Sequence, residues 1–312
     1  MTNRPILELR SRIRRALRDV FDSRGFVEVD TPVLAPEVLP EAHIDPIAVP
    51  VDGPDRPPHY LQASPEALMK RLLAAGSGPI YQFARAFRAG ERGSRHDVEF
   101  VLLEWYAPGT TLADAAVLLE ALCHAALGTS GIERISCSRA FTALAGVDPL
   151  GASLADLAAA GHRAGLAIPE QNNLLPADQQ WDRWFEWLLA EVVTPRLGHD
   201  RPTMLEAWPV SQAAFARIDP DEQKTARRFE LFVRGVELAN GWEEDTGRSL
   251  LESRIAAANR IRAADGRAVL PVPKRLLDAH GPAMPEGVGV ALGFDRLVML
   301  AAGADSIHAV RG

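Results

Sequence analysis

Two glutamates within one predicted β-hairpin are the first residues whose spacing suggests chemistry. Arg234 and Gly235 form a two-residue turn between apolar runs, with glycine where a positive φ is needed. In that register Phe232 faces Glu237, so Glu230 and Glu237 lie on one face as diagonal neighbours, about 7 Å apart by backbone. Such a carboxylate pair is typical of a solvated outer face, but together with substrate phosphates it also suits Mg²⁺. The hairpin residues leave both interpretations open.

Arg296 is the second candidate, because it falls in the first turn of a helix predicted from about Asp295 to Ala302. A cation there opposes the helix macrodipole by roughly 0.3 to 1 kcal/mol unless an anion compensates. Beside free backbone N–H groups, such an arginine suits a phosphate. The more frequent arrangement is a salt bridge to Asp295 or to another carboxylate.

A charged loop is the third candidate. Residues 79–88 and 98–106 predict the strands of an antiparallel hairpin whose long loop spans 89–97. Glu104 and Tyr106 share one face of the second strand. Basic side chains crowd the loop region: Arg88, Arg92, Arg95 and His96. Each array alone fits a solvated surface, but three in one chain favour a common site.

The elements that must position these residues follow from the apolar periodicity. Residues 9–24 predict a helix with an apolar face and with most of its arginines opposite, and residues 26–30 predict a strand. Residues 64–66 (SPE) are typical of a helix start, with Ser at the N-cap. The chain from 111 to about 200 is predicted helical, and 287–293 is predicted to be a buried strand. Four side chains at helical spacing are expected in the core: Trp181, Trp184, Phe185 and Leu188.

The composition is that of a globular protein. The 312 residues are 47% hydrophobic with a formal net charge of -7, which excludes collagen-like and disordered classes. Cys123 and Cys137 are the only cysteines and form no CxxC pair, so neither a disulfide framework nor a thiolate metal cage is expected, and a cytoplasmic location is predicted. The charged N-terminus and the lack of a long apolar run predict neither a signal peptide nor a membrane span. A pI near 5.7 argues against a broad nucleic-acid surface.

Several common catalytic and nucleotide-binding motifs are missing. The sequence contains no P-loop, no HExxH and no GxSxG, and the glycine-rich strand does not match GxGxxG. A nucleotide site in this chain therefore needs another scaffold.

Three segments resemble the motifs of class II aminoacyl-tRNA synthetases of the lysine subgroup. Residues 87–106 resemble motif 2, residues 289–297 (GVALGFDRL) resemble motif 3, and the first helix with residues 28–32 (EVDTP) resembles motif 1. Within that group the sequence resembles the elongation factor P lysine ligase family. Further matching positions are 64–66, 69–73 (MKRLL), 235–241 (GVELANG) and Ala291, where lysyl-tRNA synthetases usually carry Gly.

This resemblance implies an α+β fold, the class II aminoacyl-tRNA synthetase catalytic core, with an antiparallel β-sheet flanked by helices. It implies one catalytic domain over residues 1–312, with a helical insertion at about 111–200 and without the N-terminal anticodon-binding OB domain. A homodimer formed through the motif 1 region is also expected.

The implied activity is an ATP-dependent ligase that uses ATP and Mg²⁺. Lysine or (R)-β-lysine would become an aminoacyl-adenylate and pass to a lysine side chain of elongation factor P, with tRNA not expected as a partner. Two alternatives are a truncated lysyl-tRNA synthetase-like paralogue that acylates tRNA or another small acceptor, and a catalytically silent regulatory paralogue.

The resemblance also assigns residues to roles, with Glu104 and Glu244 expected near the side-chain ammonium of the substrate. The expected catalytic residues are Arg88, Arg296 and Glu237. The expected ATP-binding residues are Arg88, Glu91, Arg95, His96, Asp97, Glu237, Leu238, Gly293 and Arg296. The expected amino-acid pocket comprises Ser64, Pro65, Glu66, Glu104, Tyr106, Asn240, Glu244 and Ala291. The expected magnesium ligands are Glu230 and Glu237.

Two positions in the motif 2 loop depart from the family pattern. Ala89 and Gly90 stand where the family has Asn-Glu, so we expect the neighbouring Glu91 to meet the adenine amino group. Asp97 stands where the family has an Asn that contacts ATP. Its extra negative charge needs an offset from Mg²⁺ or Arg95.

Overall fold

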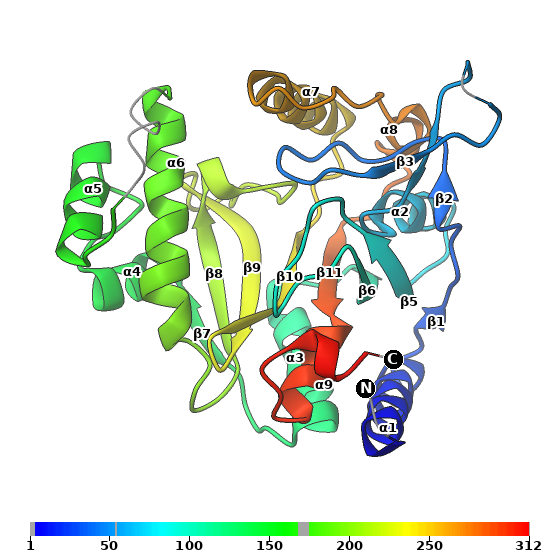
Figure 1. Ribbon diagram of the computed structural model, residues 1–312, viewed down its shortest axis with the longest axis horizontal. Coiled ribbons are helices and arrows are strands. Elements are labelled where there is room, and N and C mark those ends of the chain that lie inside the picture. Colours follow the sequence, from blue (N-terminus) through cyan, green and yellow to red (C-terminus); the bar gives the residue numbers. More distant parts are fainter. Residues whose placement is uncertain (1–3, 54, 168–174, 312) are drawn as a thin grey trace. The chain divides into compact units, whose positions relative to one another are not determined.

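The computed structural model describes residues 4–53, 55–167 and 175–311 (Figure 1). The chain divides into two compact units. The first comprises Met1–Ala115, His124–Gly128 and Glu244–Gly312, and the second comprises Ala116–Cys123 and Thr129–Glu243. The predicted site residues therefore fall on both units.

The first helix, α1 (Arg4–Asp22), starts earlier than predicted. The expectation that its arginines point away from the core is wrong in part. The Arg10 guanidinium lies 4.7 Å from the ring centre of Phe294, and that of Arg14 lies 4.5 Å from the ring centre of Phe83. Cation–π attraction stabilises these guanidinium groups against the aromatic rings. The apolar face is as predicted and buries Ile13, Leu17 and Phe21.

The strands of the first unit follow the order β1-β5-β6-β11. β5 (Ile80–Phe87) and β6 (Glu99–Pro108) form the predicted antiparallel hairpin. β11 (Gly287–Gly293) pairs antiparallel with β6. β1 (Val27–Glu28) is shorter than the predicted strand over 26–30 and runs parallel to β5. This arrangement places the motif 2 and motif 3 segments on neighbouring strands.

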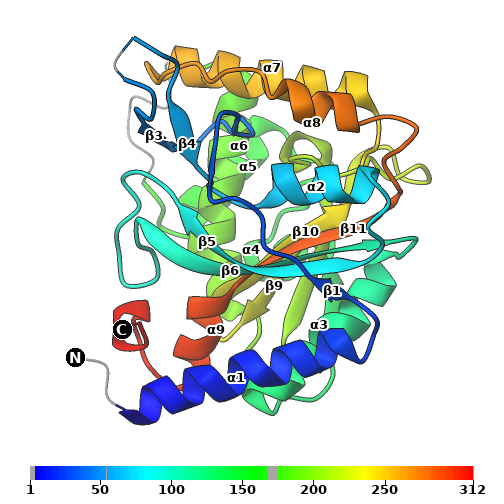
Figure 2. The same cartoon turned by 90° about the vertical axis from the view of Figure 1, so that its right-hand side faces the viewer.

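Helices cover both faces of these strands (Figure 2). α1 and α9 (Phe294–Ala301) lie on one side, and α2 (Glu66–Ala74), α7 (Arg248–Ala264) and α8 (Lys274–Ala279) lie on the other. α2 and α9 both pack against β6. A small separate sheet has the order β2 (Leu34–Ala35), β4 (His59–Leu61) and β3 (Ile47–Val49).

The strands of the second unit follow the order β10-β9-β8-β7. β10 (Val236–Glu243), β9 (Thr225–Val233) and β8 (Thr203–Pro209) are antiparallel neighbours. β7 (Glu133–Ser136) pairs parallel with β8. This short strand lies in a region predicted to be helical, because four residues are too few to show a period against long helical neighbours.

The helices of the second unit lie beside β7 and β8 (Figure 1). The predicted aromatic core is confirmed: Trp184, Phe185 and Leu188 are buried, and Trp181 packs against them. The rings of Phe141 and Phe185 stack with centroids 4.7 Å apart. The bounds are α4 (Cys137–Ala145), α5 (Leu154–Arg163) and α6 (Ala177–Leu188), while α3 (Leu112–Leu127) has residues in both units.

The second hairpin has the predicted turn, with Val236 opposite Val233 and Glu237 opposite Phe232 as predicted. Arg234 and Gly235 both have positive φ, 52° and 68°, as this tight turn requires. A register shift after Glu237 places Asn240, rather than Ala239, opposite Glu230. A β-bulge therefore adds one residue to β10 beyond the predicted pairs, and Glu237 keeps its predicted place opposite Phe232.

The predicted fold class is confirmed. Helices flank strands that are mostly antiparallel, with parallel pairing at β1–β5 and β7–β8. Among the helices of the described residues, none is long and apolar enough to cross a membrane.

Candidate active site

A buried lysine joins two of the predicted pocket glutamates in the first unit. Glu66 opens α2, and Lys70 follows one turn later on the same face. Lys70 Nζ lies 2.6 Å from Glu66 Oε1 and 2.7 Å from Glu244 Oε2, and the residue is only 2% exposed. Burial alone would lower the pKa of Lys70, but the charges of Glu244 and Glu66 outweigh it and raise the pKa. Lys70 is therefore charged.

Glu104 is the third carboxylate of this pocket. Tyr106 donates its hydroxyl to Glu104 Oε1 at 2.7 Å, and Ser64 donates to Glu104 Oε2 at 2.9 Å. Burial, and next the negative charge of Glu66, raise the pKa of Glu104 to about 8. The carboxylate thus lacks a cationic partner strong enough to keep its pKa low, and a bound ammonium would supply one.

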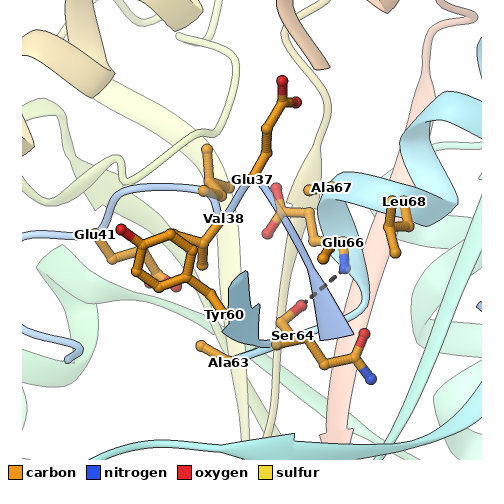
Figure 3. Close-up of a pocket in the computed structure, with 12 residues that line it drawn as sticks. Glu37, Val38, Glu41, Tyr60, Ala63, Ser64, Glu66, Ala67 and Leu68 are labelled. Atoms are coloured by element: carbon orange, nitrogen blue, oxygen red, sulfur yellow. Dashed lines mark hydrogen bonds between the residues drawn. The ribbon is translucent and has the colours of Figure 1, made fainter. Parts of the chain in front are cut away.

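Ser64 connects the carboxylate to the helix start. Its Oγ accepts the backbone N–H of Glu66 at 3.0 Å, as a capping serine does, although the helix boundary places Pro65 at the N-cap. Figure 3 shows this bond beside a cavity of about 30 Å³ lined also by Glu41 and Gln62. Burial raises the pKa of Glu41 to about 7.

Small residues of β11 form the strand opposite these carboxylates. Gly289 pairs with Tyr106, and Ala291 pairs with Glu104. A Cβ on Gly289 would lie 2.4 Å from Glu244 Oε1 and 2.5 Å from the Tyr106 ring, which no side chain can occupy. Main-chain bonding also fixes Glu244, whose N–H donates at 2.8 Å to the first carbonyl of β11. Glycine is therefore required where carboxylate and tyrosine converge.

The charge of the cluster has a chemical consequence. Glu66, Glu104 and Glu244 contribute three carboxylates against the single ammonium of Lys70, an excess of two negative charges when all are ionised. Buried charges are costly unless paired. The pocket therefore matches a ligand with two ammonium groups better than one with a single ammonium.

Arg88 lies at the base of the charged loop. Its guanidinium stacks over the Phe100 ring at 5.0 Å, and Nη1 lies 3.5 Å from Glu91 Oε1. Glu91 also lies 3.6 Å from His96 Nδ1. Burial would raise the pKa of Glu91, but the hydrogen bond with His96 and the charge of Arg88 outweigh it and lower the pKa. Glu91 is thus an ionised acceptor within the loop.

Arg296 contacts the other arm of the same loop. Its Nε donates to the carbonyl oxygen of Arg95 at 3.3 Å, and Nη2 lies 3.3 Å from His96 Nε2. The carboxylate of the neighbouring Asp295 is engaged by Arg10, at 2.6 Å. The structure thus brings Arg296 together with two of the predicted ATP-binding residues.

Four of the predicted residues lie in the second unit: Glu230, Glu237, Leu238 and Asn240. Glu230 is only 8% exposed, and Arg228 Nη2 lies 2.5 Å from its Oε1. Arg228 Nε also donates to Asn240 Oδ1 at 3.3 Å. Leu238 is the extra residue at the register shift and is buried.

Carboxylates such as Glu230 and Glu237 are suitable ligands for Mg²⁺, which takes one or two carboxylates plus phosphate oxygens. Within the ranges that the structure describes, no group of three or more His, Cys, Asp or Glu side chains is arranged to hold a metal by itself.

Sequence reasoning missed roles for Lys70, Arg228 and Arg311. Lys70 belongs to the matching segment 69–73, and its spacing of four from Glu66 on a buried helix face is the signal that indicates an internal pair. Arg228 alternates with Glu230 on one strand, which gave a weaker signal. Nothing in the sequence placed Arg311 beside Asp97, where its Nη1 lies 2.5 Å from Oδ2.

Comparisons with known proteins identify the family of the chain. The pattern of the family described as tRNA synthetases class II (D, K and N) matches residues 2–311, and the chain belongs to this family. Similar proteins of known name indicate which members of this family the chain resembles in sequence. The chain is 37% identical over 306 residues to the elongation factor P–(R)-β-lysine ligase of Salmonella gallinarum, covering 97% of this chain and 93% of the relative. Ligases of the same name from Enterobacter sp. and Salmonella dublin match equally well. The protein is thus a ligase of the class II synthetase type, which implies the use of ATP.

Proposed function

We propose that this protein activates (R)-β-lysine, or lysine, with ATP and transfers it to a lysine side chain of elongation factor P. The observation that carries the proposal is the pocket of Glu66, Glu104 and Glu244 with Lys70 as its internal cation, because its excess of two negative charges matches the two ammonium groups of such a substrate. The names of the relatives support the acceptor. They also favour this activity over tRNA acylation and over a silent paralogue.

The first step would join the substrate carboxylate to the nucleotide. A carboxylate oxygen attacks the α-phosphorus of ATP, the bond to the bridging oxygen breaks, and pyrophosphate leaves. No base is needed, since the carboxylate is already ionised. Arg88, at the loop base, would hold the carboxylate and the α-phosphate, and Arg296 would hold the remaining phosphates. Arg95 and His96 would contact the nucleotide from the loop.

Mg²⁺ would be held by Glu230 and Glu237 and would neutralise phosphate charge. Arg228 lies against Glu230 and would set the orientation of that carboxylate. In the second step an uncharged amine of the acceptor attacks the acyl carbon, AMP leaves, and the amine gives up a proton to form the amide.

Selection of the amino acid would rest on shape as well as charge. Gly289 and Ala291 have small side chains or none, so they leave space beside Tyr106 and Glu104, with which they pair. Ala291 would fill part of the space that a glycine leaves open. Pro65, which precedes α2, and Asn240, from the second unit, would also contact the amino acid.

Pyrophosphate exchange tests the proposal. The protein should catalyse ATP–pyrophosphate exchange with (R)-β-lysine, and with lysine more weakly or equally, but not with norleucine, which lacks the side-chain ammonium. Incubation with elongation factor P should then add one aminoacyl mass to that protein. Exchange that is absent with both diamino acids contradicts the proposal, and charging of total tRNA instead of elongation factor P would favour the truncated synthetase.

We further propose that the chain acts as one catalytic domain, as a homodimer and in the cytoplasm. These expectations come from the family. Light scattering of the purified protein tests the homodimer.

A further inference from the structure

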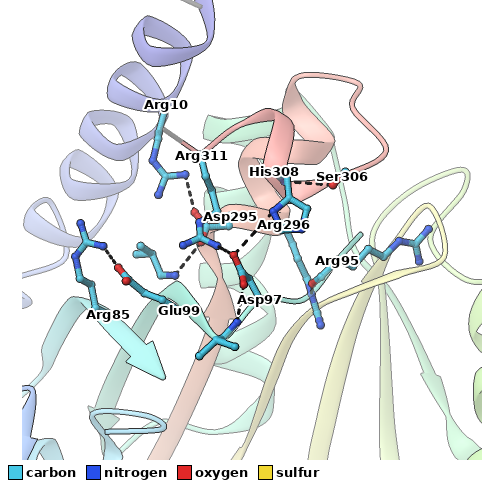
Figure 4. Close-up of polar contacts among 12 residues, drawn as sticks. Arg10, Arg85, Arg95, Asp97, Glu99, Asp295, Arg296, Ser306, His308 and Arg311 are labelled. Carbon is cyan, nitrogen blue, oxygen red and sulfur yellow. Dashed lines mark hydrogen bonds and ion pairs between the residues drawn. The ribbon is translucent and has the colours of Figure 1, made fainter. Parts of the chain in front are cut away.

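The C-terminal segment 306–311 is bound to the charged loop 89–97 (Figure 4). Ile307, itself buried, donates its N–H to the carbonyl oxygen of Ser94 at 2.8 Å. His308 Nε2 lies 3.1 Å from the carbonyl oxygen of the residue before that serine. These contacts use the main chain of the loop, so they depend on its conformation rather than on its side chains.

A charge pair completes this attachment. Arg311 Nη1 lies 2.5 Å from Asp97 Oδ2, and His308 Nδ1 lies 3.9 Å from the same oxygen. The other oxygen, Oδ1, accepts the N–H of Val98 at 2.8 Å. The Val98 hydrogen bond, together with Arg311, lowers the pKa of Asp97, so it stays ionised. Both oxygens of this carboxylate therefore have partners within the protein.

The C-terminal segment is itself anchored. Arg311 Nε lies 3.8 Å from Asp295 Oδ2, and Asp295 pairs with Arg10 of α1. Asp295 Oδ2 also accepts the N–H of Val101 on β6 at 2.9 Å. The loop is thus connected through Arg311 to the buried end of α9 and to the sheet.

The proposed nucleotide-binding residues Arg95 and His96 lie in the part of the loop that the C-terminal segment contacts. Arg95 and His96 lie between the residues bonded to Ile307 and Arg311, and both contact Arg296. A loop that is free to move would lose this arrangement, because a long exposed loop has many conformations of similar energy.

We propose that Arg311, with Ile307 and His308, positions the loop 89–97 for the nucleotide and neutralises the charge of Asp97 there. Arg311 is thus a positioning residue. The nucleotide part of this inference rests on the proposed function, whereas the attachment of the loop does not. All of these contacts lie within the first unit.

Hydrogen exchange of the ligand-free protein tests the attachment. Arg311→Met should speed amide exchange over residues 92–97, because the loop loses its charged tether. Arg311→Lys should restore part of the protection. Arg248→Met is the matched control, since Arg248 pairs with Glu252 and Asp278 on α7 and α8. Unchanged exchange in Arg311→Met would overturn the proposal.

Calorimetric titration with ATP tests whether Arg311 neutralises the charge of Asp97. Arg311→Met should weaken ATP binding by roughly five- to tenfold, the range expected for a partly exposed charge pair. The double variant Arg311→Met/Asp97→Asn should recover part of this affinity, because the uncompensated carboxylate is gone, whereas its loop amides still exchange fast and the loss due to the mobile loop remains. A double variant that binds ATP as weakly as Arg311→Met would overturn the role of charge. In kinetics, KM for ATP should change more than kcat.

The two proposals fail in different ways. If the unaltered protein does not bind ATP, the proposed function is wrong, and the exchange experiment still decides whether Arg311 holds the loop.

Discussion

The ammonium of Lys70 lies 2.6 Å from the carboxylate of Glu66, one turn earlier in α2, and both are buried. A second carboxylate, from Glu244, lies 2.7 Å from the same nitrogen. The lysine therefore holds together two acidic residues from different segments of the first unit. Two glutamates this close would repel each other without it, and one would take up a proton.

Removal of this lysine should destabilise the protein. Lys70→Met leaves two buried carboxylates uncompensated, and breaking a buried ion pair in this way costs about 3 to 5 kcal/mol. Chemical denaturation should show the loss, and Lys274→Met, at an exposed position, should show none. Stability equal to that of the unaltered protein would mean that Lys70 does not carry this charge balance.

The pH dependence of stability should reflect Glu104. Its pKa is about 8 in the folded protein and near 4.5 when unfolded, so the folded state binds more protons between these values. Stability should therefore fall as pH rises from about 5 to 8. Urea unfolding at several pH values measures this slope. Glu104→Gln should flatten it in part, because Glu41 contributes with the same sign.

Substrate affinity should change with pH in the opposite direction. A bound ammonium favours the ionised form of Glu104, so binding of (R)-β-lysine should release a proton and strengthen as pH approaches 8. Calorimetry in buffers of different ionisation enthalpy counts that proton. Glu104→Gln should bind without releasing it.

Gly289→Ala should block the pocket. The added carbon would lie 2.4 Å from Glu244 Oε1 and 2.5 Å from the Tyr106 ring. We expect KM for the diamino acid to rise by about fivefold or more, since overpacking of this kind costs about 1 to 3 kcal/mol. Gly151→Ala is a suitable control, because no atom lies within 4 Å of the added carbon there. An unchanged KM would show that the ligand binds elsewhere.

The metal assignment predicts a change in Mg²⁺ dependence. Glu230→Gln removes one of two proposed ligands, so the Mg²⁺ concentration for half-maximal pyrophosphate exchange should rise several-fold. Glu206→Gln, on the neighbouring β8, removes a carboxylate that pairs with Arg134 and should leave that concentration unchanged. Equal Mg²⁺ dependence in both variants would exclude Glu230 as a ligand.

Local patterns were sufficient to predict most elements near the site. The turn at Arg234 and Gly235 needed only the positive φ that this sequence favours, and the hairpin of β5 and β6 followed from two apolar runs around a charged loop. The bulge after Glu237 could not be predicted, since it depends on how β10 fits its neighbour. The same holds for β7, whose few residues become a strand only by pairing with β8.

The sequence by itself determined which carboxylates and arginines are available and on which strand or helix each one lies, because those properties depend on neighbours a few residues away. Only the tertiary structure decided that Lys70 is an internal cation between Glu66 and Glu244, and that Arg311 neutralises Asp97. Ion pairing depends on distances of a few ångströms between side chains far apart in the chain. Such distances are fixed by packing, which no local pattern records.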